Sequence, residues 1–582
     1  MKRISRGLAP LFIFAVAFGV FTAPPAMADH TNPREPILPT EPGFPGETPL
    51  ITGEGTWELL ANFPYPPVDG GGSDHKFFTM EGDIYAAVGT LGQHDAAIGQ
   101  RILKLTEEGT VNPTWVADHG SAACPPANAS VTGLQHDQAF LGTISKKMLK
   151  RIEKVPARSL VVTPEVMLDA TDATGRCHDP VGGGIELVDI SELTDPAFEP
   201  REIHLVRHAG TSHTVTVDDA RPWIYYNNTS NGSGTPWIDV VDTRSCLGLA
   251  GLTLEEKRER CRPKVYRLPY KQEWSPAGAT CHDLTSRGNL IYCAALNTTL
   301  IFDVGGIVKK KGGLKGRPLA CELTAGTMTG AMVTDCSAIP PPEEGQETSS
   351  LGGFRFLGTV PHDGTLPPTE DIATAHQAYP TPDKHWMFVT DERGGGVVPP
   401  GATCVPGVEN PQGNGGIHVF DISDPKNIEY ALTPDGAKAV WIAEPQIPSP
   451  SFCTVHVIEQ MVGEQRFAVG YYTQGAKVLD WWVDEEGQFT FRETASIILP
   501  NANVWSVSPF KIEDHGDGTK TYYMIASDIN RGIDVLSWTG PSNPIGTPPP
   551  AGRAAEGSAD PGLLMLALFS LPALIRARRR LA

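Results

Sequence analysis

The sequence predicts an all-β fold, a seven-bladed β-propeller of four-stranded antiparallel blades with long loop insertions. Three observations predict it: a histidine recurs at the head of a short strand pattern, an apolar β-branched run follows each copy, and no long helical pattern separates the copies. The six histidines are His75, His136, His213, His282, His376 and His456, and a seventh copy has Trp505 at this position. Seven such units are expected to close into a ring.

Each copy continues with further predicted strands. The second strand is an apolar and aromatic run, such as WMFVTDE at 386–392 and RFAVGYY at 466–472. The third usually ends in aspartate, as in GGIHVFDI at 415–422, and a fourth can be read in several units. The fourth unit shows the blade in its shortest form, with Ser-Arg-Gly-Asn at 286–289 as the hairpin turn.

The units differ in length because of insertions. Successive markers lie 49 to 94 residues apart, more than the ~40–50 of compact propeller repeats. The surplus is expected in loops, the largest of them at 163–184, 244–274, 305–350 and 392–416.

Two segments, IELVDISELTDP at 185–196 and IHVFDISDPKNI at 417–428, carry a family pattern. With the strand before each of them, they resemble the LVIVD-repeat family of bacterial surface propellers. The resemblance covers roughly residues 70–540 and implies the propeller fold. Its motifs are a structural repeat, so it carries no catalytic residue to this chain.

The amino-terminal end is typical of a secretory signal peptide. Lys2, Arg3 and Arg6 precede an apolar stretch, and Ala26-Met27-Ala28 forms a cleavage site before Asp29. We therefore assign residues 1–28 to the signal, 29–69 to an amino-terminal extension and 70–540 to the propeller. An amino-terminal membrane anchor is the alternative for the first segment.

The carboxy-terminal end is expected to sort or anchor the protein. A linker rich in Pro, Gly and Ala at 541–561 precedes an apolar tail at 562–582, which has four arginines close to its end. The tail is similar to the sorting tails of the PEP-CTERM kind, with Asp560-Pro561-Gly562 in place of Pro-Glu-Pro. A tail retained as a stop-transfer anchor is the alternative. Both predict a bacterial protein that is secreted, periplasmic or on the cell surface, with membrane contact only through its tail.

The charge of the chain limits its partners. The formal net charge is −20, and seven of the 47 basic residues lie in the signal and the tail. A surface this acidic repels phosphate backbones, so we expect no nucleic-acid binding. A protein or a small molecule bound at the channel mouth remains as the expected partner.

The ten cysteines of an exported chain favour disulfides over thiol catalysis. Cys246 with Cys261 and Cys321 with Cys336 would each close one inserted loop. Cys281 and Cys293 lie on opposite strands of one predicted hairpin. The remaining four, Cys124, Cys177, Cys404 and Cys453, cannot be paired from sequence, and no Cys-x-x-C motif occurs.

The six histidines are expected near one mouth of the central channel, because the first strand of each blade lines that channel. Some of the six could bind iron, copper or zinc. Alternatively, each could hydrogen-bond within its own blade to a polar residue such as Asn228, Asp391 or Asp528. A ligand-binding mouth without metal is the third possibility.

The function expected from the sequence is that of an exported, surface-associated binding or interaction module whose histidines are mainly structural. The alternative is a metal-dependent oxidoreductase that uses several of the six histidines, and an extracellular hydrolase ranks last. No G-x-S-x-G, Walker or H-E-x-x-H motif occurs, so no catalytic residue is assigned.

Overall fold

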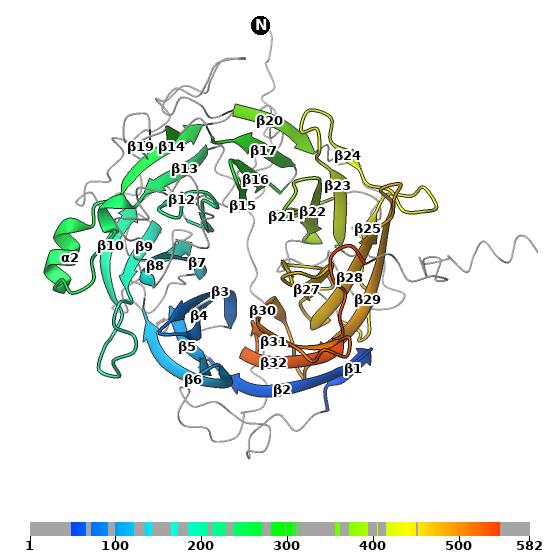
Figure 1. The fold of residues 1–582 in the computed structure, drawn as a ribbon, viewed down its shortest axis with the longest axis horizontal. Coiled ribbons are helices and arrows are strands. Elements are labelled where there is room, and N and C mark those ends of the chain that lie inside the picture. Colours follow the sequence, from blue (N-terminus) through cyan, green and yellow to red (C-terminus); the bar gives the residue numbers. More distant parts are fainter. Residues whose placement is uncertain are drawn as a thin grey trace, which may run out of the picture.

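The computed structural model describes residues 48–65, 71–90, 99–120, 134–142, 164–172, 184–207, 212–227, 237–269, 281–296, 298–305, 308–309, 313–314, 355–360, 372–393, 404, 415–449 and 452–547. In these residues the predicted seven-bladed propeller is confirmed: seven antiparallel sheets surround a central axis (Figure 1). The strands are short and alternate with turns, as the repeated apolar runs predict.

The first three blades each contain four sequential strands. Blade 1 contains β3 (Gly72–Met80), β4 (Asp83–Thr90), β5 (Gln100–Glu107) and β6 (Thr110–His119). Blade 2 contains β7 (Leu134–Gly142), β8 (Pro164–Asp172), β9 (Gly184–Asp189) and β10 (Arg201–Arg207). Blade 3 contains β11 (Val215–Val217), β12 (Ile224–Asn227), β13 (Trp237–Asp242) and β14 (Lys264–Pro269).

Blades 4 and 5 carry small departures from this pattern. Blade 4 contains β15 (Asp283–Arg287), β16 (Leu290–Ala294), β17 (Thr299–Asp303) and β20 (Arg355–Val360), and a hairpin of β18 (Val308–Lys309) and β19 (Gly313–Leu314) lies in its insertion. Blade 5 contains β21 (Ala375–Pro380), β22 (Trp386–Asp391) and β23 (Ile417–Asp421), and its edge is shared by β24 (Glu429–Tyr430) and β25 (Val440–Trp441).

Blades 6 and 7 are completed by the amino-terminal part of the chain. Blade 6 contains β26 (Ile458–Gln460), β27 (Arg466–Gly470), β28 (Ala476–Val483) and β29 (Phe489–Ile498), with β1 (Leu50–Gly53) as a fifth strand. Blade 7 contains β30 (Val504–Asp514), β31 (Thr519–Asp528) and β32 (Gly532–Pro541), with β2 (Thr56–Phe63) as its outer strand. Residues that the sequence analysis placed in an extension before the propeller thus close the ring.

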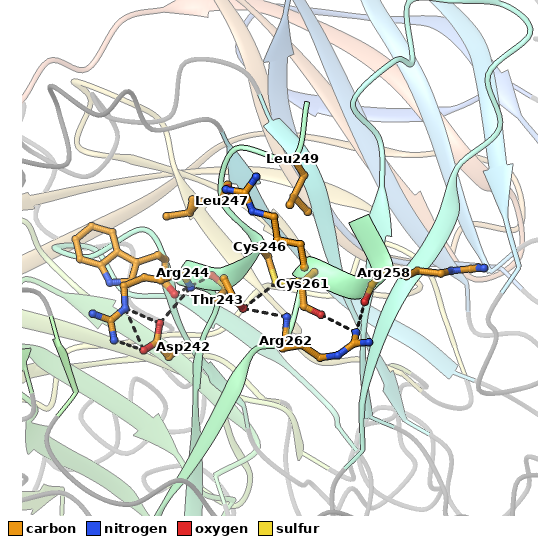
Figure 2. The surroundings of a disulfide bond; sticks show 12 residues. Asp242, Thr243, Arg244, Cys246, Leu247, Leu249, Arg258, Cys261 and Arg262 are labelled. Carbon is orange, nitrogen blue, oxygen red and sulfur yellow. Dashed lines mark hydrogen bonds and ion pairs between the residues drawn. A yellow bond between two sulfur atoms is a disulfide. The ribbon is translucent and has the colours of Figure 1, made fainter. Parts of the chain in front are cut away.

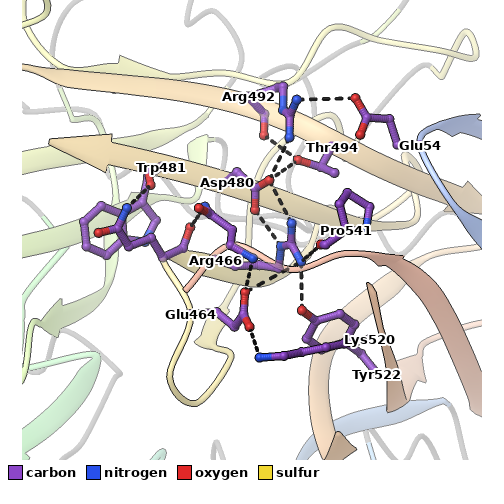
Figure 3. A network of polar contacts seen from close by, with 12 residues as sticks. Glu54, Glu464, Arg466, Asp480, Trp481, Arg492, Thr494, Lys520, Tyr522 and Pro541 are labelled. Atoms are coloured by element: carbon purple, nitrogen blue, oxygen red, sulfur yellow. Dashed lines mark hydrogen bonds and ion pairs between the residues drawn. The ribbon is translucent and has the colours of Figure 1, made fainter. Parts of the chain in front are cut away.

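A buried ionic network reinforces this closure (Figure 3). Arg466 of blade 6 is fully buried and binds Asp480 through two nitrogens, at 2.5 and 2.8 Å. It also donates to the Tyr522 hydroxyl and to the Pro541 carbonyl of blade 7, at 2.9 and 2.7 Å. The Lys520 ammonium group of blade 7 donates a hydrogen bond to the Glu464 carboxylate, at 2.5 Å. The network therefore joins the two blades where the ring closes.

The hydrophobic core is divided among the contacts between neighbouring blades. One cluster, for example, joins Phe78 and Met80 of blade 1 to Met167 and Val188 of blade 2. Another joins Tyr292 of blade 4 to residues of blade 5. Each sheet is therefore covered on both faces by its neighbours, which leaves the inner strands to line the channel.

The insertion between β13 and β14 of blade 3 is ordered by a disulfide and a capped helix (Figure 2). It holds a short 3₁₀ helix, η3 (Arg244–Cys246), and α2 (Leu254–Arg260), and the predicted Cys246–Cys261 bond closes it. Thr253 and Glu256 form a capping box at the start of α2. Lys257 reaches the buried Asp189 of blade 2 at 2.7 Å. The insertion is thereby fixed to the outer part of the propeller.

Three disulfides lie in the described residues. The predicted Cys281–Cys293 bond is confirmed, and a Cys404–Cys453 bond that the sequence did not predict joins the insertion of blade 5 to blade 6. The proposed Cys321–Cys336 bond lies outside the described residues. These bonds indicate an extracellular or otherwise oxidising compartment. Within the described part of the chain, no helix is long and apolar enough to cross a membrane.

Candidate metal centre at the channel mouth

The repeated ring position lies at the start of the innermost strand of each blade. His75, His136, His376 and Trp505 lie in β3, β7, β21 and β30, and His213, His282 and His456 come one or two residues before β11, β15 and β26. In four blades a register shift that marks a β-bulge falls at this position, for example between Ala375 and Ala378. Bulges re-aim side chains, which accounts for rings that face the axis.

Four of the six histidines form a continuous arc. The ring centroids of His213 and His282 lie 4.3 Å apart, those of His282 and His376 4.5 Å, and those of His376 and His456 3.9 Å. Trp505 ends the arc, 4.1 Å from His456. Each contact joins neighbouring blades. The rings therefore pack against one another from blade to blade around the axis.

His75 differs from the arc. Its Nδ1 lies 2.7 Å from the Ser527 hydroxyl and 2.9 Å from the Ser506 hydroxyl, both in blade 7. Burial lowers the pKa of His75 to about 3. This histidine is thus held by blade 7 and serves the closure of the ring. The side chain of His136 lies outside the described residues.

The aspartates expected to hold the histidines have other partners. Asp391 accepts hydrogen bonds from the backbone N–H groups of Ala373 and Thr374 and from Arg393. Asp528 accepts from the backbone N–H groups of Asn503, Asn530 and Arg531. These carboxylates brace the strand ends at the mouth. Asn228 lies outside the described residues.

A carboxylate that the sequence analysis did not select completes the cluster. Glu392 follows β22 and is only 5% exposed. Ligand atoms of His282, His376 and Glu392 all lie within 4.8 Å of one another. The Nε2 atom of His456 lies 3.8 Å from Oε1 of Glu392, and Nε2 of His376 lies 3.9 Å from Oε2. The signal in the sequence was the final Glu of WMFVTDE, whose position at the mouth depends on the closure of the ring.

Burial favours the neutral forms of the histidines and of the carboxylic acid in this cluster. Burial, together with the neighbouring imidazoles, lowers the pKa of His282 well below its usual value, and burial does the same to His456. Neutral imidazoles offer the lone pairs that a metal needs. Burial raises the pKa of Glu392 to about 8, although the Tyr472 hydroxyl opposes this shift. A cation at this position would offset the cost of a buried carboxylate charge.

Charged side chains from several blades meet in the channel next to the ring. Lys76 follows His75, and its Nζ lies 3.7 Å from Asp137 of blade 2. Partial desolvation in the channel lowers the pKa of this half-exposed lysine, but Asp137 and other carboxylates, among them Glu459 of blade 6, raise it overall. Burial, with the nearby Asp137, raises the pKa of Asp283 to about 8. The channel is therefore polar, and Lys76 partly neutralises its carboxylates.

Disulfides hold two members of the arc in place. Cys281 directly precedes His282 and is bonded to Cys293 on the next strand. The backbone N–H of His282 also donates to the Ala294 carbonyl at 2.6 Å. Cys453 lies three residues before His456 and is bonded to Cys404. These crosslinks pre-organise the arc, because they restrict the segments that carry two of its imidazoles.

Comparison with known proteins gives no family. No family model matches the sequence, and no curated protein matches it. Solved structures similar to it include a protein from Lactobacillus plantarum, at 12% identity and a TM-score of 0.37 over 77% of this chain and 93% of that chain. The β-propeller domain of Cps50 (Swd1) from Myceliophteria thermophila has 10% identity and a TM-score of 0.37, and the match covers 80% of this chain and 99% of that chain. Saccharomyces cerevisiae Sqt1 has 7% identity and a TM-score of 0.40, and the match covers 85% of this chain and 100% of that chain.

Proposed function

We propose that this chain is an exported β-propeller that binds a transition metal ion at one mouth of its channel, and that it acts there as a metal-dependent oxidoreductase. The observation that carries the proposal is the convergence of His282, His376 and Glu392, whose ligand atoms lie within 4.8 Å of one another. Two imidazoles and one carboxylate make up the ligand set of non-haem iron oxygenases. Zinc also accepts this set.

The neighbouring histidines support a centre with more than three donors. His213 packs on His282 on one side, and His456 packs on His376 on the other. Imidazoles that share one ion through bonds of about 2.1 Å have ring centroids roughly 4.5–5 Å apart. The His282–His376 spacing lies at the lower end of this range and the other two lie below it, so the outer rings would have to move apart to share one ion.

The protein would hold the ligands of the ion in place and keep the site away from bulk water. A bound iron would supply one-electron chemistry at its open coordination positions. His282 and His376 would offer nitrogen lone pairs from blades 4 and 5, and Glu392 would balance the charge of the ion. Trp505, only 6% exposed, would close the arc on one side and limit the access of water. This arrangement favours a metal centre over a purely structural role of the histidines.

The cellular location forms part of the proposal. The signal-like residues 1–28 and the apolar tail at 562–582 lie outside the described residues, and their sequence supports export followed by retention at the surface of a bacterial cell. The disulfides agree with an oxidising compartment. The resemblance to LVIVD-repeat surface propellers supports the same location.

Metal analysis tests the metal centre on which this function depends. We expect the full chain, stripped of metal by a chelator and then incubated separately with Fe²⁺, Zn²⁺ and Cu²⁺, to retain one ion per chain of at least one of these metals after gel filtration. Elemental analysis would measure the retained metal, and circular dichroism would confirm that the protein is folded. A folded chain that retains none of the three would overturn the metal centre and favour a binding module with a packed histidine ring.

A further inference from the structure

A tyrosine from the next blade lies beside the carboxylate of the proposed centre. Val389 of blade 5 pairs with Ala378, and Val469 of blade 6 pairs with Ile458. Glu392 and Tyr472 each come three residues after these paired valines, so they occupy equivalent positions in adjacent blades. The Tyr472 hydroxyl donates a hydrogen bond to Oε1 of Glu392. The contact therefore crosses the boundary between two blades.

The ring of Tyr472 is fixed by aromatic neighbours. It is fully buried and lies edge-on to His456 and to Trp505, with centroids 5.3 and 6.0 Å away. Phe452 lies 5.7 Å away, at a smaller interplanar angle. Because these contacts surround the ring, the hydroxyl has little freedom to leave Glu392.

The backbone of Tyr472 is held in an uncommon conformation. Its φ is 40°, in the left-handed region that residues other than glycine rarely adopt. The strain is maintained by two backbone hydrogen bonds with Val504 of blade 7, at 3.0 and 2.9 Å. Strain that the surrounding structure maintains is concentrated at functional sites. Here it directs a hydroxyl from blade 6 towards a carboxylate of blade 5.

We propose that Tyr472 is the positioning residue that makes Glu392 a one-oxygen metal ligand, an inference that rests on the proposed metal centre. The hydroxyl of Tyr472 donates to Oε1, which also lies 3.8 Å from Nε2 of His456, and Oε2 lies 3.9 Å from Nε2 of His376. With the hydroxyl on Oε1, Oε2 is the oxygen that we assign to an ion shared with His282 and His376. Partners that orient a metal ligand in this way strongly affect metal affinity.

The adjacent Tyr471 supplies a matched control. Tyr471 is equally buried, and its hydroxyl donates to the backbone carbonyl of Gly415 at 2.6 Å. Tyr471→Phe and Tyr472→Phe therefore each remove one buried hydroxyl from neighbouring positions. Only Tyr472→Phe removes a hydrogen bond to the carboxylate of the proposed centre.

The test is a Co²⁺ titration of the full chain and the two variants, followed by visible absorption, which reports the coordination geometry of Co²⁺. We expect Tyr472→Phe to weaken Co²⁺ binding by about 10–100-fold and to change the positions and intensities of the bands. Tyr471→Phe should match the wild-type protein in both. Equal spectra and affinities for wild type and Tyr472→Phe would overturn the positioning role alone, whereas a wild-type protein that binds no Co²⁺ would overturn the metal centre itself.

A second variant keeps the test decisive if Tyr472→Phe does not fold. Incorporation of 3-fluorotyrosine at position 472 retains the ring and the hydroxyl and makes the hydroxyl a stronger hydrogen-bond donor. We expect the Co²⁺ bands of that protein to shift relative to wild type. Unshifted bands would contradict the proposal.

Discussion

Replacing His376 by alanine should abolish tight transition-metal binding and leave the propeller folded. His376 lies in the middle of the arc, between His282 and His456, and it is one of the three residues whose ligand atoms converge. Its loss removes one of three central donors, for which we expect an affinity loss of about 100-fold or more. Isothermal titration with the metal that the wild-type protein retains would measure the change.

His75→Ala is the matched control for this prediction. His75 belongs to the same ring of positions, but its Nδ1 contacts two serine hydroxyls of blade 7. Its removal should lower the free energy of unfolding by about 1–3 kcal/mol, because the partner hydroxyls lose a buried hydrogen bond. Metal affinity should stay within a factor of a few of wild type. Equal losses in the two variants would contradict the assignment of the centre to the arc.

Replacing Arg466 by alanine should cause the largest loss of stability. This guanidinium is fully buried against Asp480 and reaches Tyr522 and Pro541 of blade 7. Removing it leaves a buried carboxylate without its main cation, which costs about 3–5 kcal/mol. Urea unfolding with the disulfides intact, followed by tryptophan fluorescence, would measure this cost.

Arg492 provides the comparison in the same network. It also contacts Asp480, at 3.2 Å, and it reaches Glu54 at 3.3 Å, but its side chain is 27% exposed. Because solvent reaches the Arg492 guanidinium and screens both of its ion pairs, Arg492→Ala should change the free energy of unfolding by about 1 kcal/mol or less. A loss for Arg466→Ala no greater than that for Arg492→Ala would show that the network does not secure the ring closure.

The sequence predicted the blades and the ring positions because both depend on local patterns. The histidine before each inner strand and the apolar runs that follow are visible within single repeats, and the short separation of Cys281 and Cys293 identified their hairpin. The fold confirmed these features. The separation of His75 from the arc of four histidines could not be predicted. The serines that hold His75 come from blade 7, at the other end of the propeller chain.

The most informative residues of the site depend on contacts between blades. Glu392 was visible only as the end of an apolar run, and Tyr472 as the end of the next. Their meeting depends on the registers of two sheets and on how the sheets pack, which no single repeat encodes. The same holds for β1 and β2, whose partners β29 and β32 lie more than 400 residues away along the chain.

Anomalous X-ray diffraction from crystals of the metal-loaded protein would locate the bound ion. We expect one strong anomalous peak at the absorption edge of the bound metal, between the ring nitrogens of His282 and His376 and Oε2 of Glu392. A loaded crystal with its anomalous signal elsewhere on the molecule, and with the arc of imidazoles packed closed, would contradict this expectation.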